Sequence, residues 1–164
     1  MPSTRALLVW WLLRASLAWA AWAQEVEGTV SFDAKGPAGF KIRGEATRIL
    51  VSDDGRDLKV SVKLEDIDTG IGLRNRHMLE DTHAKDFPTV TLSVPSASVV
   101  ETGGPIEASG TFEINGQRKE TRFVYTPRCA GGTCEIEGSA KLNLSDFGIK
   151  VRAYLGVTVK PDIT

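Results

Sequence analysis

The sequence contains few of the side chains on which catalytic and metal sites most often depend. Its 164 residues include only two histidines and two cysteines, and all four tryptophans fall within the first 23 residues. The CxxC spacing of redox-active cysteines is absent, and no serine or cysteine nucleophile motif accompanies the histidines. These absences disfavour thiol, zinc and nucleophilic chemistry, so the function has to be sought in the arrangement of the apolar residues.

A strong excess of positive charge is also absent. The first 23 residues carry Arg5 and Arg14 but no acidic residue, so beyond them the 20 basic residues fall to 18 against 21 acidic ones, a net charge of −3. Both signs are interspersed, which gives no basic footprint for nucleic acid or for an anionic membrane. We therefore expect no nucleic-acid partner, and we expect recognition by shape and apolar contact.

The first 23 residues are typical of a secretory signal peptide. Arg5 gives a basic start, "ALLVWWLL" and "ASLAWAAWA" are apolar, and "AWA" before Gln24 is a small-x-small cleavage site. Arg14 interrupts the apolar residues, so no run approaches the roughly 20 residues that a membrane-spanning helix needs. The residue after the predicted cleavage site is Gln24 and not a cysteine, so no lipid anchor is implied. We predict an exported protein with a signal peptide at 1–23, one domain at 24–164 and no integral membrane span in the mature chain.

Beyond the signal peptide, apolar and polar residues alternate. "LKVSVKL" at residues 58–64 places leucine and valine on one face and lysine and serine on the other, the pattern of a strand with one buried side. The same alternation recurs along the chain and predicts eight strands, with a bulge near residues 46–48. The predicted strands lie at 29–32, 40–51, 58–64, 89–94, 106–114, 120–125, 136–144 and 151–159.

Turn residues separate these strands as an antiparallel meander requires. "DDGRD" at 53–57, "TGGP" at 102–105 and "NGQ" at 115–117 are hairpin signals. Alternation stops between Asp66 and Pro88, where the sequence offers at most one or two helical turns. The predicted fold is all-β: a single eight-stranded antiparallel β-barrel with a short helical or irregular insertion around residues 66–88. Closure into a barrel removes the exposed edges of such a sheet.

Cys129 and Cys134 enclose the glycine-rich segment "AGGT". In an exported protein, such a pair is by default a disulfide. We predict that it joins the two ends of a hairpin loop.

Six residues assigned to the inner face of the predicted barrel are small. Two interpretations remain open. The small residues leave a hollow, since eight strands enclose a space just wide enough for one slender ligand. Alternatively, larger neighbours fill the space where the sheet coils tightly. The six residues are Gly44, Ala46, Ala108, Gly110, Gly138 and Ala140.

Polar side chains are densest in "LRNRHMLEDTHAKDFPTVTL", residues 73–92. His77 and His83 have acidic residues nearby, but zinc needs three or four convergent ligands, and this spacing does not place both rings on one helical face. A histidine can also act as an acid or base. We favour a barrel corner in which Arg74, Arg76 and His77 bind carbonyls and carboxylates. Arg74 and His77 are also the candidates for contacting a polar head group at the mouth of a tunnel.

Four segments, "IDTGIGLRNRHM", "FPTVTL", "GTFEINGQRKETRF" and "LNLSDFGI", occur in this order. Together they resemble the YceI-like family of exported lipid- or polyisoprenoid-binding proteins, over about residues 26–163. The resemblance implies a lipocalin-like barrel, a hydrophobic tunnel, a polyprenyl lipid or quinone as ligand, and a periplasmic location. The chain departs from the family pattern at Ser145, where arginine is common, and at Thr82 and His83, where aromatic residues are common. The cysteine hairpin is not a general family feature.

The predicted function is that of an exported, non-enzymatic carrier of a small apolar amphiphile, with no cofactor beyond a bound isoprenoid lipid or quinone. The location is periplasmic, with secretion as the alternative, and a homodimer is left open. Two other functions remain: an enzyme that acts on a lipid-like substrate with His77 as acid or base, and a solid barrel that serves as a structural or interaction module. For Phe147, both a tunnel-wall and a core position fit the motif "SDFGI". The candidate tunnel-wall residues are Phe32, Leu92, Ala108, Gly110, Phe112, Phe123, Tyr125, Ala140 and Phe147.

Overall fold

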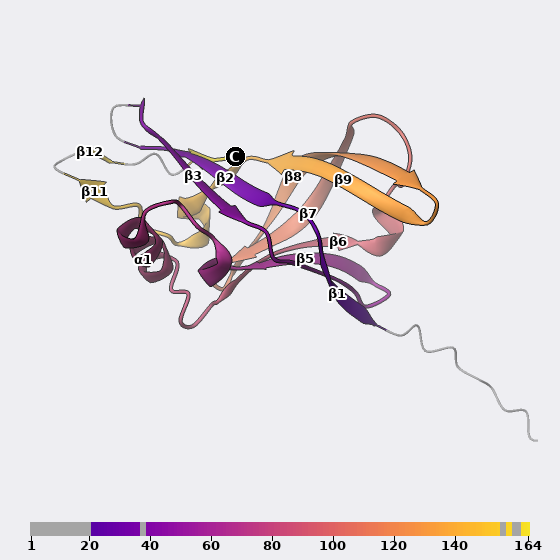
Figure 1. Ribbon diagram of the computed structural model, residues 1–164, viewed down its shortest axis with the longest axis horizontal. Coiled ribbons are helices and arrows are strands. Elements are labelled where there is room, and N and C mark those ends of the chain that lie inside the picture. The colour runs from indigo at the N-terminus through magenta and orange to yellow at the C-terminus, as the bar shows by residue number, and fades with distance from the viewer. Residues whose placement is uncertain (1–20, 37–38, 155–156, 159–161) are drawn as a thin grey trace, which may run out of the picture.

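The computed structural model describes residues 21–36, 39–154, 157–158 and 162–164 (Figure 1). Most of the predicted signal peptide, residues 1–20, therefore lies outside the described residues. Its last residues, Trp22 and Ala23, begin strand β1 (Trp22–Val26). The described part of the chain is mostly β-structure with one short α-helix.

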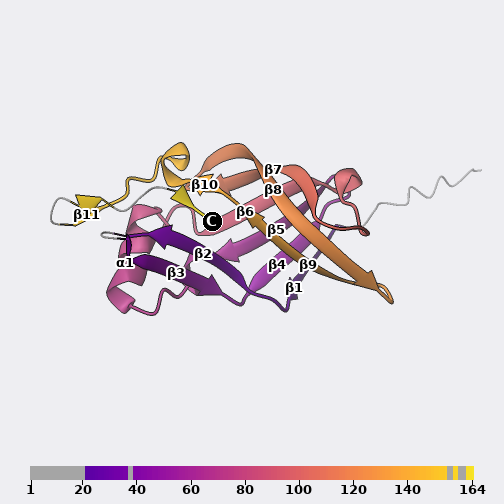
Figure 2. The ribbon, with the colours of Figure 1, turned by 90° about the horizontal axis from the view of Figure 1, so that it is seen from above.

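The larger of the sheets has seven antiparallel strands and curls strongly, as Figures 1 and 2 show. From β4 to β9 the order of strands in the sheet is their order in the chain, so the predicted meander is confirmed. Neighbours along the sheet are β1, β4 (Ile49–Asp53), β5 (Asp57–Lys63), β6 (Thr89–Pro95), β7 (Ile106–Ile114), β8 (Gln117–Ala130) and β9 (Thr133–Ala140).

A smaller sheet shares chain segments with the larger one. In three places, two strands that follow one another closely along the chain lie in different sheets. These pairs are β1 and β2, β3 and β4, and β9 and β10. An antiparallel all-β fold is thus confirmed as a half-barrel plus a small sheet, but the pairings among the described residues do not show one closed eight-stranded barrel. The smaller sheet has the order β10 (Leu142–Asn143), β13 (Asp162–Ile163), β2 (Val30–Lys35) and β3 (Lys41–Ala46).

Two predicted strands are divided in the structure. The strand expected at 40–51 is interrupted at Thr47 and Arg48, which lie within the predicted bulge. The strand expected at 136–144 is interrupted at Lys141, where the chain passes from β9 to β10. At both breaks the chain leaves one sheet for the other. The alternation shifts phase at the first break, where Ala46 and Ile49 are both buried, and continues through the second.

The prediction of one continuous strand at 151–159 is wrong. β11 (Ala153–Tyr154) and β12 (Val157–Thr158) pair with each other in antiparallel fashion, so the chain reverses between them. Residues 155–156 and 159 lie outside the described residues. Strand β13 was not predicted, because two residues are too few to show alternation.

The insertion between β5 and β6 is helical, as predicted, but more regular than expected. A short 3-10 helix η2 (Leu64–Asp66) precedes α1 (Gly72–Asp81), whose ten residues exceed the one or two turns expected. Two further 3-10 helices, η3 (Ser96–Ser98) and η4 (Leu144–Phe147), follow β6 and β10.

Two of the predicted hairpin turns have the backbone that their residues favour. Asn115 and Gly116, between β7 and β8, have φ values of 51° and 68°. Two successive positive φ angles define the type I′ turn that "NG" predicts. In the β4–β5 turn, the Asp54 carboxylate accepts hydrogen bonds from the backbone N–H groups of Arg56 (3.0 Å) and Asp57 (2.8 Å).

Buried side chains form two clusters on the same side of the larger sheet. The first contains Ala46, Ile49 and Val62, with Ile67 from the segment after η2 packed against it. The second contains Ile114, Phe147 and Ile149, with Val90, Phe112, Leu142 and Leu144 around them. Alternation therefore predicted correctly which side of the strands is buried.

Larger neighbours occupy the space at the inward glycines. A Cβ atom placed on Gly110 would lie 2.8 Å from Leu92 Cδ1, and one on Gly44 would lie 2.3 Å from the Phe32 ring. At Gly138 the nearest atoms would be the Val124 carbonyl oxygen at 3.0 Å and Tyr125 Cβ at 3.2 Å. Of the two interpretations left open, tight coiling filled by neighbours is the correct one at the buried Gly44 and Gly110, whereas Gly138 is exposed.

Candidate functional site: a half-covered apolar face

Seven apolar side chains share the inner side of the curled sheet. Val51 of β4 pairs with Val60 of β5, Val60 with Leu92 of β6, and Leu92 with Phe112 of β7. Directly paired residues in antiparallel strands point to the same side of the sheet. We define the inner apolar face as Val51, Val60, Leu92, Ala108, Phe112, Phe123 and Ala140, in which Ala108 pairs with Phe123 and Phe123 with Ala140.

All seven side chains of this face are only half-buried, although they lie on the side of the sheet that carries the core. Core residues on the same strands, such as Val62 and Ile114, are 5% and 4% exposed. Protein interiors are normally close-packed, with few voids as large as a water molecule. The inner apolar face is therefore apolar surface that the described part of the chain does not fully cover.

The opposite side of the same strands is mostly polar. Ser61 of β5 and Thr91 of β6 are paired there, and their hydroxyl oxygens are 3.0 Å apart. Lys59 pairs with Ser93, and Thr111 with Glu120. This contrast favours the inner side over the outer side as a site for an apolar ligand.

Tyr125 lies near one end of the inner apolar face and fixes a loop beside it. The phenol oxygen accepts a hydrogen bond from the Val100 N–H (2.9 Å) and donates one to the Val100 carbonyl (3.3 Å). The Tyr125 ring is 5.8 Å from the Phe123 ring, measured between centroids. On β9, Ile136 points to the same side and is 53% exposed, so apolar surface continues toward the tip of the β8–β9 hairpin.

The predicted tunnel-wall residues fall into two groups. Leu92, Ala108, Phe112, Phe123 and Ala140 belong to the inner apolar face, and the half-buried Phe32 lies on β2 of the smaller sheet. The second group is buried within the protein itself: Gly110, Tyr125 at 7% exposure and Phe147 at 1%.

Phe147 occupies the core rather than the inner apolar face, packed with Ile114 and Ile149. Two members of the face, Val51 and Val60, were not among the candidates. The alternation of "LKVSVKL" places Val60 inward, so the pattern could have identified it.

Asn75 organises the corner that precedes α1. Its side-chain oxygen accepts hydrogen bonds from the Thr69 N–H (2.8 Å) and hydroxyl (2.5 Å), and its amide group donates to Asp68 (2.8 Å). The Gly70 N–H also donates to Asp68, at 2.9 Å. The hydrogen bond from Asn75 and, to a smaller extent, the one from Gly70 lower the pKa of the Asp68 carboxyl.

Arg74 also belongs to this corner. Its guanidinium donates a hydrogen bond to the Thr69 carbonyl, as the corner interpretation predicted. Its Nε atom is buried without a hydrogen-bond partner among the described residues. His77 is half-buried on α1. Whether either side chain contacts a ligand head group stays a prediction.

His83 joins the end of the insertion to the β7–β8 turn. Its Nδ1 atom is 2.8 Å from the Asn115 side-chain oxygen, and the Asn115 amide group donates to the Phe147 carbonyl at 2.9 Å. Because the Asn115 oxygen can only accept, His83 Nδ1 carries the proton. His83, at a position where the family pattern commonly has an aromatic residue, thus makes a structural contact between distant segments.

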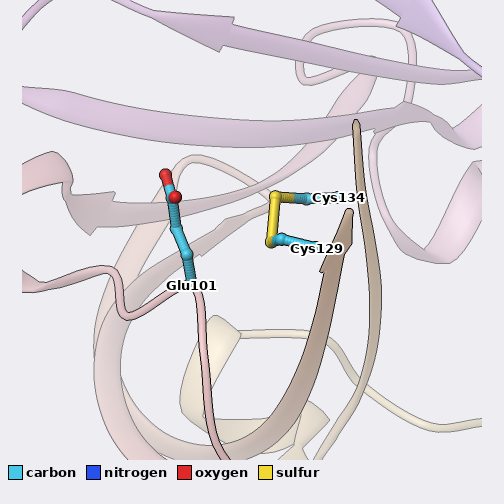
Figure 3. Close-up of side chains that lie close together, drawn as sticks. All are labelled: Glu101, Cys129 and Cys134. Atoms are coloured by element: carbon cyan, nitrogen blue, oxygen red, sulfur yellow. A yellow bond between two sulfur atoms is a disulfide. The ribbon is translucent and has the colours of Figure 1, made fainter. Parts of the chain in front are cut away.

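The cysteines form the predicted disulfide. Cys129 and Cys134 are directly paired across β8 and β9, with a Cα–Cα distance of 4.0 Å. Figure 3 shows Glu101 beside them, and its carboxylate lies within 4.8 Å of both sulfur atoms. Among the described residues, this is the one group of three side chains with metal-ligating atoms that close together. Its two sulfurs are bonded to each other, so they are not available as thiolate ligands.

A hollow of about 170 Å³ lies at the outer surface near β4 and β5. Its walls include Glu25, Arg48, Lys63 and Asp66, and Arg48 lies 3.6 Å from both Glu25 and Asp66 as ion pairs. Ligand pockets usually have about 300–1,000 Å³, so this hollow is smaller than most. This hollow therefore does not suit a long apolar ligand.

A strongly curled antiparallel sheet with an apolar inner side defines the class of barrel-related β-proteins. Within this class, the chain belongs to the YceI-like domain family, whose model matches residues 14–164. The resemblance found in the sequence motifs is thus confirmed. None of the helices among the described residues is long and apolar enough to cross a membrane.

Individual relatives are distant. A UPF0312 protein of Pseudomonas aeruginosa is 24% identical over 133 residues, which cover 77% of this chain and 61% of that protein. The match thus spans less than two thirds of the relative's length.

Two solved structures are similar in fold. Burkholderia cenocepacia BcnA matches with a TM-score of 0.65 at 17% identity, over 82% of this chain and 90% of that one. A polyisoprenoid-binding domain from Saccharophagus degradans, implicated in plant cell wall breakdown, matches with a TM-score of 0.64 at 12% identity, over 86% of this chain and 92% of that one. At these identities the likeness shows the fold.

Proposed function

We propose that this protein is a non-enzymatic carrier that binds a long apolar amphiphile, an isoprenoid lipid or quinone, against the inner apolar face. The observation that carries the proposal is the half-burial of all seven side chains of that face. Apolar surface on the core side of a fold, left partly uncovered by the protein, is suited to an apolar ligand that completes the packing.

The driving force is the removal of the ligand chain from water. Each buried methylene contributes about 0.8 kcal/mol before ordering costs. A wall of valine, leucine and phenylalanine therefore holds a long chain with few polar contacts. Part of the proposal is a closed tunnel: the two sheets, linked where β1 passes to β2, β3 to β4 and β9 to β10, form a ring of eight strands around the ligand.

Three further features support the proposal. The predicted signal peptide directs the chain to the periplasm or the exterior, and the Cys129–Cys134 disulfide suits such an oxidising compartment. Membership of the YceI-like family agrees with a binding role. The S. degradans neighbour is named for polyisoprenoid binding, which is an analogy at the level of fold. Arg74 and His77 are the head-group contacts in this proposal.

The test is native mass spectrometry of the protein purified without detergent from its own cell envelope, followed by solvent extraction and identification of the lipid. We expect one apolar adduct of isoprenoid or quinone mass per chain. If the protein carries none, delipidated protein is titrated with ubiquinone and with undecaprenyl phosphate. Failure to bind either compound, together with a bare mass, would overturn the proposal.

A further inference from the structure

Three of the most exposed large apolar side chains gather at one end of the molecule. Phe40 is 62% exposed, Ile71 52% and Leu73 51%. Phe40 lies in the connection between β2 and β3, and Ile71 and Leu73 lie where α1 begins. Figures 1 and 2 both place α1 and the β2–β3 hairpin at the left end of the molecule. A β-bridge joins Glu45, near the end of β3 that is farther from Phe40, to Asp68 just before α1.

Both segments protrude from the body of the protein. A Cβ atom placed on Gly39, next to Phe40, meets no atom within 4 Å, and the same is true at Gly70 and Gly72 on either side of Ile71. The apolar side chains here are therefore not held against a neighbouring element. Single exposed apolar residues are ordinary, but three together on protruding segments indicate a contact surface.

Basic side chains border this surface. Lys35 and Lys41 pair with each other at the end of the β2–β3 hairpin, and the exposed Arg76 follows Leu73 by three residues on the same side of α1. The ion pairs between described residues include none of the three. The whole-chain composition predicts no basic footprint, but the fold brings these three charges to one end.

The acidic groups in and around α1 have other partners. Asp68 accepts hydrogen bonds from Asn75 and Gly70. At the other end of α1, Arg152 lies 2.8 Å from Glu80 and 2.7 Å from Asp81. None of these carboxylates forms an ion pair with Lys35, Lys41 or Arg76, so the three basic groups are left to face a partner.

We propose that this end docks on the surface of a lipid bilayer that contains anionic lipid. Phe40, Ile71 and Leu73 enter the head-group region, and Lys35, Lys41 and Arg76 face the phosphates. Apolar side chains bordered by basic ones are the pattern of proteins that lie on a membrane without crossing it. The inference goes beyond the proposed carrier function, because it assigns the surface on which the protein would meet a membrane and uses none of the residues of the inner apolar face.

The test is co-sedimentation of the purified protein with vesicles of phosphatidylcholine and phosphatidylglycerol that contain no isoprenoid or quinone. We expect binding that weakens with added salt and is weaker to phosphatidylcholine alone. The double variant Ile71→Asp/Leu73→Asp is expected to bind about tenfold more weakly or worse, because it places charge where apolar contact is needed. Phe40→Asp should act in the same direction.

The matched control is Leu50→Asp on the outer side of β4, where Leu50 is 47% exposed. It should leave vesicle binding unchanged. The proposal is overturned if the unaltered protein does not sediment with anionic vesicles, or if Leu50→Asp weakens binding as much as the double variant. Ala140 lies on the inner apolar face and not on the docking surface. The Ala140→Phe variant should therefore sediment with the vesicles normally even when it no longer binds an isoprenoid lipid or quinone. Failure of docking is thus distinguishable from failure of the carrier function.

Discussion

Phe123 and Ala140 face each other across the β8–β9 pair, and both side chains are only half-buried on the inner side of the curled sheet. The preceding residue of β9, Ser139, points to the outer side, where it pairs with Val124. Adjacent positions of one strand thus face the proposed ligand space and the solvent. This arrangement supplies a site variant and its control one residue apart.

Ala140→Phe is expected to abolish or strongly weaken the binding of an isoprenoid lipid or quinone while the protein stays folded. The added ring occupies the space beside Phe123 that the ligand would fill. Quinone titration followed by fluorescence or native mass spectrometry measures the loss, and circular dichroism checks the fold. Ser139→Phe adds the same volume on the outer side and should bind normally. Equal affinity in both variants would remove this part of the face from the ligand site.

Gly110→Ala is expected to destabilise the protein without acting through the ligand. A Cβ atom at this position would lie 2.8 Å from Leu92 Cδ1 and 3.0 Å from the Ser93 carbonyl oxygen. Overpacking of this kind costs about 1–3 kcal/mol of unfolding free energy. Urea unfolding of the ligand-free protein measures it.

Gly104→Ala is the control for this variant, because a Cβ there meets no atom within 4 Å. It should change stability little. If Gly110→Ala were as stable as the unaltered protein, the space at Gly110 would not be filled by its neighbours, and the hollow interpretation would regain support there.

Local patterns predicted the parts of this fold that depend on neighbouring residues in the chain. The period-two pattern of "LKVSVKL" identifies Val60 and Val62 as inward, because side chains alternate across any strand. The same pattern could not show that Val62 is buried while Val60 is only half-buried. That difference depends on which distant segments pack above each residue.

The parts that were missed depend on contacts between distant segments or on polar side chains. β13 is two residues long and is positioned by pairing with β10 and β2. The regularity of α1 was underestimated because the helix has no apolar stripe that would predict it. Its start is held instead by the hydrogen bonds of Asn75 with Thr69 and Asp68. Composition contains no signal for such contacts.

Removal of the disulfide by Cys129→Ser/Cys134→Ser is expected to lower the unfolding free energy by about 2 kcal/mol, because the short loop restricts the unfolded chain modestly. Urea unfolding of the double variant measures the change. The unaltered protein with a reductant should show a similar loss, whereas the variant should not respond to the reductant. A reductant effect on the double variant would show that the loss does not come from this bond.

Asp68 is expected to make stability depend on pH in the acidic range. Hydrogen bonds from Asn75 and Gly70 lower its pKa in the folded protein, so its contribution is fully present above the unfolded-state pKa of about 3.9 and is lost as the pH falls through the lower, folded-state pKa. Asp68→Asn removes this contribution. The urea midpoint of the unaltered protein should therefore exceed that of the variant near neutral pH, and the difference should shrink once the pH falls below about 4. The control is Asp86→Asn, at an exposed position after α1, which removes one negative charge without touching the corner that contains Asp68. A difference between the Asp68→Asn variant and the unaltered protein that stays constant down to strongly acidic pH would show that the Asp68 carboxylate does not stabilise the start of α1 through its charge.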